Sequence, residues 1–484
     1  MKKEQEQILI EKTKKLSVKE AGAYSFMDGF GLRYVTPYAL AVGANNSQIG
    51  LLSSVPGLLG TLFQLFTLKL MRYFTRKKII FWSVFAQAVM WLVLILAGIP
   101  FFILGMKTSF SADAVIIIYT LLILVGAIGG PAWTSMMRDL VSKDRGEYFG
   151  RRSRISGAIA LACMFIAGFV LDYFKQTHVF IGFIVLFFIA FLGRLGSALM
   201  FRKHYDPKFE VDDKKYFTLL DFVKKMRHNN FGRFVLYYSF LSFACALASP
   251  FFAVYILRDL GFSYTQYMIT VVANSIVTMA LMPIWGKFAD RYGNLKVMKI
   301  CGAFIPILPF LWILISLANS VFYAVIIVIV LEICSAIIWS GFNLAAGNFI
   351  YDAVSRERLA ICSSYFNILN AVGALIGALI GGYLSSHNVT ILGWNPILFL
   401  FLLSGVARVI VYFVMSRKII EVREVKYFSL SRHIFSEVNL VGRKLRHLTK
   451  DILESVSLRK FFESMVSESE HLFSSNPNNF AKNN

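Results

Sequence analysis

The sequence predicts an all-α membrane protein with twelve transmembrane helices in two pseudo-symmetric six-helix halves. Its mean hydropathy is +0.62 and only 16% of its residues are charged, whereas soluble domains carry about a quarter charged residues. Its 484 residues contain twelve long apolar runs, and segments of the first half recur 213 or 214 positions later. Together these three observations predict the fold class.

Each apolar run is long enough to cross a bilayer as a helix, which takes about 20 mostly apolar residues. The apolar residues are continuous rather than alternating, and backbone groups in lipid must pair within the run, so we expect helices and not strands. The predicted runs are 22–43, 48–70, 79–105, 114–137, 153–173, 178–201, 232–257, 264–285, 296–317, 321–347, 361–385 and 395–416.

The repeat is clearest in the charged loop after the fourth run, DLVSKDR, which returns after the tenth run as DAVSRER. Asp139 and Arg145 of the first loop match Asp352 and Arg358 of the second. Membrane chains with repeated halves are commonly transporters whose binding site lies between the halves. The repeat therefore indicates transport of a small-molecule substrate.

Lys and Arg concentrate in the even-numbered connections between runs, while the odd-numbered ones carry only Lys107, Lys175 and Arg258. Positive loops stay on the cytoplasmic side, so we expect a multi-pass protein of the cell membrane with both termini cytoplasmic. The predicted parts are an N-terminal segment (1–20), a first half (21–201), a cytoplasmic linker (202–230), a second half (231–417) and an amphipathic cytoplasmic tail (418–484).

The net charge of +22 does not indicate a nucleic-acid partner, because the basic residues lie in short loops and tails and not on one polar face. The five Cys residues have no metal or disulfide spacing, and the seven His residues lie in loops or tails. No P-loop or nucleophile triad is present either. We expect no enzyme activity, no cofactor and no metal site, and a monomer in the lipid bilayer.

The loop between the eighth and ninth runs reads GKFADRYGNLK from Gly286 to Lys296. Gly286 permits close helix approach, Gly293 permits a tight turn, and Asp290 can cap a helix or pair with a basic group near helix eleven. The pattern resembles the G-x-x-x-D-R-x-G-x-x-[KR] loop of the major facilitator superfamily. The resemblance implies that Asp290 and Arg291 belong to a latch between the cytoplasmic ends of the halves.

The matching first-half loop, Leu68 to Lys78, departs from the pattern, with Arg72 in place of Asp and Thr75 in place of Gly. A symmetrical latch is therefore not expected. The segment from Gly129 to Gly150 also resembles this superfamily. It lacks the Arg in helix four and the Gly-Pro element in helix five of the family's drug antiporters, so no subfamily is predicted.

Charges inside apolar runs are costly in hydrocarbon and commonly face a cavity or a partner. Asp28 and Arg33 in the first run and Glu332 in the tenth are the candidates for substrate binding or proton coupling. Asp28 and Arg33 stand five residues, or about 140°, apart on an α-helix, so they need not pair. The alternative is a structural ion pair between helices. Arg194 and Arg408 occupy matching places in both halves, which favours a structural role at helix-end carbonyls or at Asp139 and Asp352.

Polar and aromatic residues in the middle of the runs complete the candidate site. Asn and Trp offer hydrogen bonds and a flat face for a small solute, although each can instead pack helices together. These candidates are Trp133, Asn274, Trp339, Asn343, Asn367 and Asn370.

The sequence thus predicts secondary active transport of a small solute, with the halves rocking about a site lined by helices one, four, seven and ten. Coupling to protons through Asp28 or Glu332 is a hypothesis based on their rarity in the apolar runs. Two alternatives stay open: a solute sensor that signals through its cytoplasmic tail, and a facilitator without ion coupling. The substrate and the direction of transport are not predicted.

Overall fold

The computed structural model describes residues 2–106, 110–141, 145–175, 177–207, 218–355, 358–386 and 395–425. The described residues up to 424 belong to one compact unit, and they form helices and connections without any strand. The predicted amphipathic helix of the tail and the centre of the predicted linker lie outside the described residues.

The first half contains the helices α1 (Lys2–Phe26), α2 (Val35–Ala41), α3 (Asn46–Leu70), α4 (Arg76–Leu96), α5 (Ile99–Phe102), α6 (Phe110–Leu140), α7 (Arg145–Lys175) and α8 (Val179–Phe201). The second half contains α9 (Leu219–Lys225), α10 (Asn230–Ala246), α11 (Phe251–Val254), α12 (Tyr264–Tyr292), α13 (Asn294–Phe304), α14 (Ile307–Ile313), α15 (Val321–Ala353), α16 (Leu359–Ser386) and α17 (Pro396–Met415). Short π or 3₁₀ segments are η1 (Met27–Gly31), η2 (Leu32–Tyr34), η3 (Tyr255–Asp259), η4 (Leu314–Leu317) and η5 (Ser416–Lys418).

Within the described ranges, eleven segments are long and apolar enough to cross a membrane, and they coincide with predicted runs two to twelve. The first predicted run is also helical, but it passes from α1 through η1 and η2 into α2. Gly29, Gly31 and Pro37 lie in this stretch, and such residues weaken regular α-helical hydrogen bonding. This run completes the twelve-helix arrangement that the sequence predicts.

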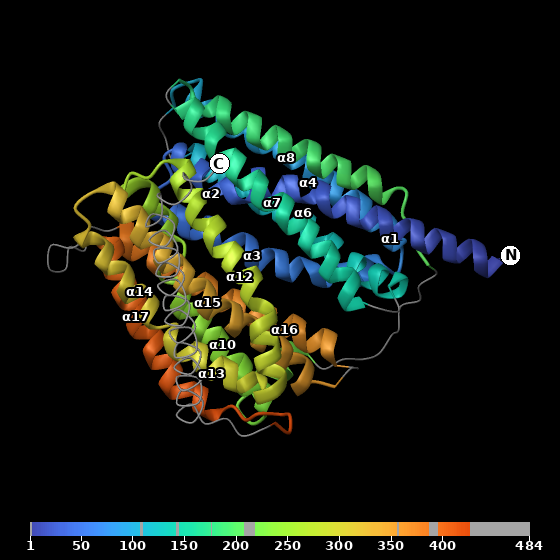
Figure 1. Ribbon diagram of the computed structural model, residues 1–484. Coiled ribbons are helices and arrows are strands. Elements are labelled where there is room, and N and C mark those ends of the chain that lie inside the picture. The colour runs from blue at the N-terminus through green and yellow to red at the C-terminus, as the bar shows by residue number, and fades with distance from the viewer. Residues whose placement is uncertain are drawn as a thin grey trace, which may run out of the picture. The chain divides into compact units, whose positions relative to one another are not determined.

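The two halves pack their helices in the same way, as the two ribbon bundles of Figure 1 show. In the first half α3 and α4 pack on α6, and α1 packs on α7 and α8. In the second half α12 and α13 pack on α15, and α10 packs on α16 and α17. The repeat in the sequence therefore corresponds to a repeat in helix packing.

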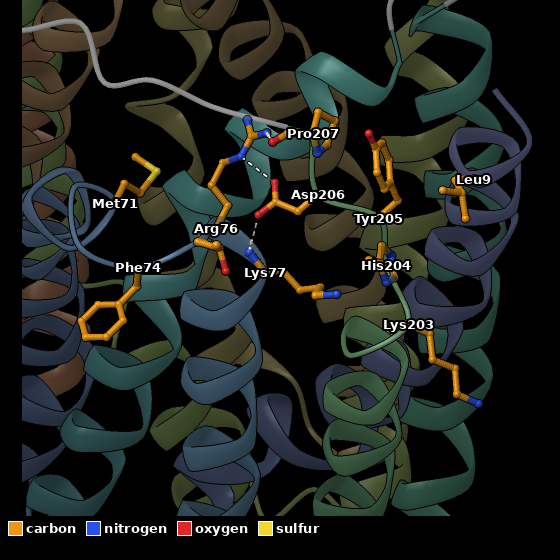
Figure 2. Close-up of a pocket in the computed structure, with 11 residues that line it drawn as sticks. Leu9, Met71, Phe74, Arg76, Lys77, Lys203, His204, Tyr205, Asp206 and Pro207 are labelled. Atoms are coloured by element: carbon orange, nitrogen blue, oxygen red, sulfur yellow. Dashed lines mark hydrogen bonds and ion pairs between the residues drawn. The ribbon is translucent and has the colours of Figure 1, made fainter. Parts of the chain in front are cut away.

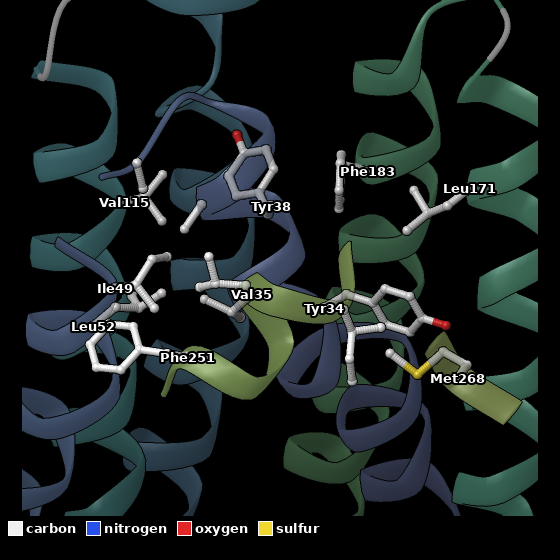
Figure 3. Close-up of a cluster of buried hydrophobic side chains, with 14 of the residues drawn as sticks. Tyr34, Val35, Tyr38, Ile49, Leu52, Val115, Leu171, Phe183, Phe251 and Met268 are labelled. Carbon is white, nitrogen blue, oxygen red and sulfur yellow. The ribbon is translucent and has the colours of Figure 1, made fainter. Parts of the chain in front are cut away.

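The halves meet through α3 against α16 and α7 against α12. A cluster of buried side chains crosses this boundary, and Figure 3 shows Tyr34 and Val35 from the first half with Phe251 and Met268 from the second. The hydroxyl of Tyr34 donates a 2.6 Å hydrogen bond to the carbonyl of Met164, which anchors η2 to α7. Close packing of this cluster stabilises the junction of the halves through van der Waals contacts.

We call this junction the closed end, because hydrogen bonds join the halves there. The side-chain amide of Asn46 donates to the carbonyl of Ser385 at 3.1 Å. One turn further along α3, a side chain at Gly50 would collide with the backbone of α16 at Ala378, so the two helices pack closely there. The carboxylate of Asp172 in α7 accepts the backbone N–H groups of Tyr264 and Thr265 at 2.8 Å each. Asp172 thereby caps the first turn of α12 in the other half.

Candidate functional site

Asp28 and Arg33 form an ion pair, with 3.6 Å between Asp28 Oδ1 and Arg33 Nε. The predicted 140° separation is wrong, because Asp28 lies in the π-helical segment η1 and Arg33 in the 3₁₀ segment η2. The i→i+5 hydrogen bonds of a π-turn bring residues five apart onto the same side. Both side chains stay partly exposed, at 24% and 48%, so the pair is accessible.

Two tyrosines near this pair were not predicted as site residues. The phenol groups of Tyr24 in α1 and Tyr119 in α6 both lie within electrostatic range of Asp28 and Arg33. Tyr24 also belongs to the repeated Tyr-Ser-Phe segment of residues 24–26 and 238–240, so the repeat offered a signal for it. Tyr119 stands in an apolar run without a comparable signal.

In the second half the structure brings two predicted residues together. The side-chain amide of Asn274 in α12 donates to Glu332 Oε2 in α15 at 2.7 Å and to the Glu332 backbone carbonyl at 3.1 Å. Tyr267, which precedes Asn274 in α12, lies within electrostatic range of both Glu332 and Arg33. Tyr267 also packs against the cluster of buried side chains that crosses the boundary between the halves.

The other polar candidates of the second half lie away from Glu332. Asn343 accepts from the Tyr238 hydroxyl and Asn370 from the Ser239 hydroxyl, both at 3.1 Å. Eleven residues separate Glu332 from Asn343, which corresponds to about 16 Å along α15. The ring of Trp339 packs against Phe342, and Asn367 is exposed on α16. The structure does not gather these four residues with Glu332.

Trp133 and Arg194 instead line a cavity of about 320 Å³ within the first half. The guanidinium of Arg152 lies 4.7 Å from the Trp133 ring, and that of Arg194 lies 5.2 Å from the Tyr24 ring. Glu20 pairs with Arg152 at 2.9 Å. Sequence reasoning missed Glu20 and Arg152, because both lie in charged stretches next to the first and fifth runs.

The two repeated arginines have partners that differ in part from the prediction. Arg194 Nε donates to Gln87 Oε1 at 2.7 Å, so the expected contact with helix-end carbonyls or Asp139 is wrong for Arg194. Arg408 Nη1 donates to the carbonyl of Ile305 at 3.4 Å, and Ile305 ends α13. The helix-end contact therefore holds for Arg408 alone.

At the end of the bundle opposite the closed end, which we call the basic end, Arg76 holds three helices of the first half together. Its side chain is 1% exposed and pairs with Asp139 at 2.5 Å and with Asp206 at 2.9 Å. Figure 2 shows Asp206 between Arg76 and the backbone N–H of Lys77, from which it accepts a 3.0 Å hydrogen bond. Sequence reasoning treated Arg76 only as a topology signal.

The family-like loop of the second half is held by the segment after α17. Arg423 pairs with Asp352 at 2.8 Å and with Asp290 at 3.7 Å. The basic partner of Asp290 therefore follows helix twelve, and the expectation of a partner near helix eleven is wrong. The hydrogen bond to Asp352 raises the pKa of Arg423 above its ordinary value, so its charge is retained.

The remaining loop residues have local roles. Gly293 has φ +92°, which favours glycine. Arg291 lies against the ring of Tyr292 at 5.3 Å, and a side chain at Gly286 would approach only Leu344. Arg145 begins α7, and the backbone N–H of Arg358 donates to the carbonyl of Ser355 at 3.0 Å.

The sequence model of the Major Facilitator Superfamily matches residues 21–346 and 234–451. The chain belongs to this superfamily. The second match begins inside the second half, as a repeated architecture requires. The family match establishes a multi-pass membrane transporter and not an enzyme.

Solved structures of transporters share the fold at low sequence identity. The nucleoside transporter NupG is 14% identical with a TM-score of 0.62, over 84% of this chain and 98% of that chain. A bacterial homologue of the iron transporter ferroportin in an inward-facing state is 14% identical (TM-score 0.61, covering 84% and 98%). A bacterial homologue of the human lysosomal transporter Spinster is 16% identical (TM-score 0.61, covering 87% and 99%). Comparison with curated protein sequences gives no significant match.

Proposed function

We propose that this superfamily member is a secondary active transporter that moves a small solute by alternating access and couples it to protons. The observation that carries the proposal is the placement of Arg33 and Glu332. They come from opposite halves, and the phenol of Tyr267 lies within electrostatic range of both. A movement of one half against the other changes the distance between these charges and hence their interaction energy.

The positions of the contacts support one of the two access states. Hydrogen bonds join the halves at the closed end, whereas at the basic end a space of about 870 Å³ is lined by residues of both halves, including Trp133, Arg138, Tyr351 and Leu359. The Lys and Arg bias assigns the basic end to the cytoplasm. In this proposal the structure represents the state that is open to the cytoplasm.

Glu332 is the stronger of the two coupling candidates. Its carboxylate accepts from the neutral amide of Asn274, while Asp28 already has the cation Arg33. A carboxylate without a cation is costly within a membrane. Glu332 can avoid this cost either by binding a proton or by approaching Arg33. We assign these two alternatives to two different arrangements of the halves.

The proposal is tested with the full chain in proteoliposomes that contain a pH-sensitive dye. Sugars, amino acids, organic anions and cationic drugs are added in turn, and a coupled solute moves protons. For that solute, Glu332→Gln is expected to lower gradient-driven accumulation at least tenfold while solute exchange continues, and Asp28→Asn is expected to weaken binding.

Asp113→Asn is the matched control, because Asp113 also pairs with an amide, accepting from Gln48 at 2.7 Å, but lies in the first turn of α6. Full accumulation in both Glu332→Gln and Asp28→Asn would contradict the coupling. Equilibration without accumulation in the unsubstituted chain would indicate an uncoupled facilitator.

A further inference from the structure

The cavity beside Trp133 carries one positive charge in excess. Three charged side chains line it: Glu20, Arg152 and Arg194. Both carboxylate oxygens of Glu20 are occupied, since Oε1 accepts from Ser197 at 2.6 Å and Oε2 from Arg152 at 2.9 Å. Glu20 therefore binds one guanidinium group and one neutral hydroxyl, and the cavity holds one carboxylate beside two guanidinium groups.

Arg194 makes no direct ion pair with any of the described residues. It is 7% exposed, and its hydrogen-bond partners are the neutral side chains of Gln87 and Ser197. Within the described residues, no hydrogen-bond partner is found for Arg194 Nη2 or for Arg152 Nη1. A buried charge of this kind is costly unless a group of opposite sign binds it.

The second half repeats the buried arginine, since Arg408 is 3% exposed, but not the charges around it. Arg408 repeats Arg194, and its partner Ile305 corresponds to Gln87. However, the positions of Glu20, Trp133 and Arg152 are occupied in the second half by Phe234, Ala346 and Tyr365. The duplicated arginine belongs to the shared scaffold, whereas the additional charges and the indole are specific to the first half.

The walls of the cavity suit a flat anion. The Trp133 and Tyr24 rings lie against the two guanidinium groups, and a side chain at Gly130 would meet nothing within 4 Å. Guanidinium groups present paired N–H donors that match the two oxygens of a carboxylate. One carboxylate would balance the single excess charge, whereas a phosphate dianion would reverse it.

We propose that this cavity binds the carboxylate of a small, planar organic monoanion, with Arg194 and Arg152 as donors and Trp133 against its apolar body. The inference rests on the proposed transport function, because it assigns the class of solute. Tyr24 lies within electrostatic range of Arg194 and Glu20 as well as of Asp28 and Arg33. Tyr24 lines the cavity and lies four residues before Asp28, so the cavity is adjacent to the groups proposed for proton coupling.

The test is calorimetric titration of the purified full chain with benzoate, nicotinate and indole-3-acetate, each beside its neutral amide. We expect at least one carboxylate to bind at least tenfold more tightly than its amide. Arg152→Gln should weaken binding of that carboxylate about tenfold and leave the amide unaffected. Arg194→Lys keeps the buried charge but loses the paired donors, so it should weaken binding while the protein remains folded.

Arg154→Gln is the matched control, since Arg154 is an exposed residue of the same helix and its guanidinium donates to the Gly150 carbonyl of its own helix. The proposal is overturned if no carboxylate is preferred over its amide, or if Arg152→Gln and Arg154→Gln bind it equally. If a neutral or cationic solute still moves protons in proteoliposomes, the transport proposal survives that failure.

Discussion

At the basic end, each half joins three helices through charged side chains, but the two halves use different charged residues. In each half an acidic residue that follows the last long helix accepts a backbone N–H group from the first turn of the third membrane helix. Asp206 accepts from Lys77 in α4, and Glu421 accepts from Leu295 in α13. In the first half the buried Arg76 then joins Asp206 to Asp139. In the second half the neutral Asn294 reaches Asp352, and the cation is the half-exposed Arg423.

The comparison separates what the fold needs from what varies. Both halves keep the capping carboxylate and the acid at the end of the fourth or tenth helix, so these groups maintain the three-helix junction. The position of the cation differs: Arg76 is buried inside the first half, whereas Arg423 lies at the surface of the second half. We infer that the first junction is rigid and that the second can open during transport.

The largest expected effect comes from Arg76→Gln, which leaves Asp139 and Asp206 without their shared cation. Breaking a buried ion pair costs about 3–5 kcal/mol. Asn294→Ala removes one neutral donor from Asp352 and should cost about 1 kcal/mol. Denaturant unfolding in detergent measures both free energies, and equal losses would contradict the difference between the junctions.

The next effect concerns the shared capping carboxylates. Asp206→Asn and Glu421→Gln each remove a charge at a helix N-terminus, and each should lower the free energy of unfolding by about 1 kcal/mol. Asp206→Asn should cost more, because it also weakens the ion pair with Arg76. The same unfolding curves measure both losses of free energy. A greater loss of unfolding free energy in Glu421→Gln than in Asp206→Asn would contradict this ranking of the two caps.

Arg423→Gln should have a small effect on stability, because its side chain is 40% exposed and exposed ion pairs contribute about 1 kcal/mol or less. If the second junction opens during transport, its effect should appear in the rate of solute exchange instead. Lys418→Gln serves as a control for loss of a nearby positive charge. Strong destabilisation without a change in exchange rate would count against an opening junction.

The smallest expected effect distinguishes the junctions by pH. His204 is buried beside the first junction with its Nδ1 at 2.9 Å from the Met200 carbonyl, and burial lowers its pKa. Its neutral form is favoured in the folded protein, so its contribution to stability is lost as pH falls below about 6.5. Two residues before its capping carboxylate, as His204 is before Asp206, the second half has the buried apolar Ile419. His204→Ile should therefore reduce the loss of stability in acid, measured by thermal unfolding at several pH values.

The fold could be predicted from the sequence because it depends on local properties, namely the length of apolar runs, their continuity and the repeat. Much of the site could not be predicted. Arg76 is buried with an ion-pair partner, Asp206, that lies 130 positions later in the chain, so the local sequence does not reveal the pair. The Asp28–Arg33 pair depends on a π-turn, which an assumption of uniform α-helical geometry does not include. Asn274 and Glu332 were identified separately, since only the packing of α12 on α15 places them together.

The most direct test of alternating access is a pair of distances between spin labels, one measured at each end of the bundle. After replacement of the native cysteines, spin labels are placed at Lys175 and Tyr323 near the closed end and, in a second variant, at Tyr73 and Tyr351 near the basic end. Addition of the coupled solute or acid should lengthen the first distance and shorten the second. If both distances change in the same direction, or neither changes while the solute is transported, the halves do not rock about a central site.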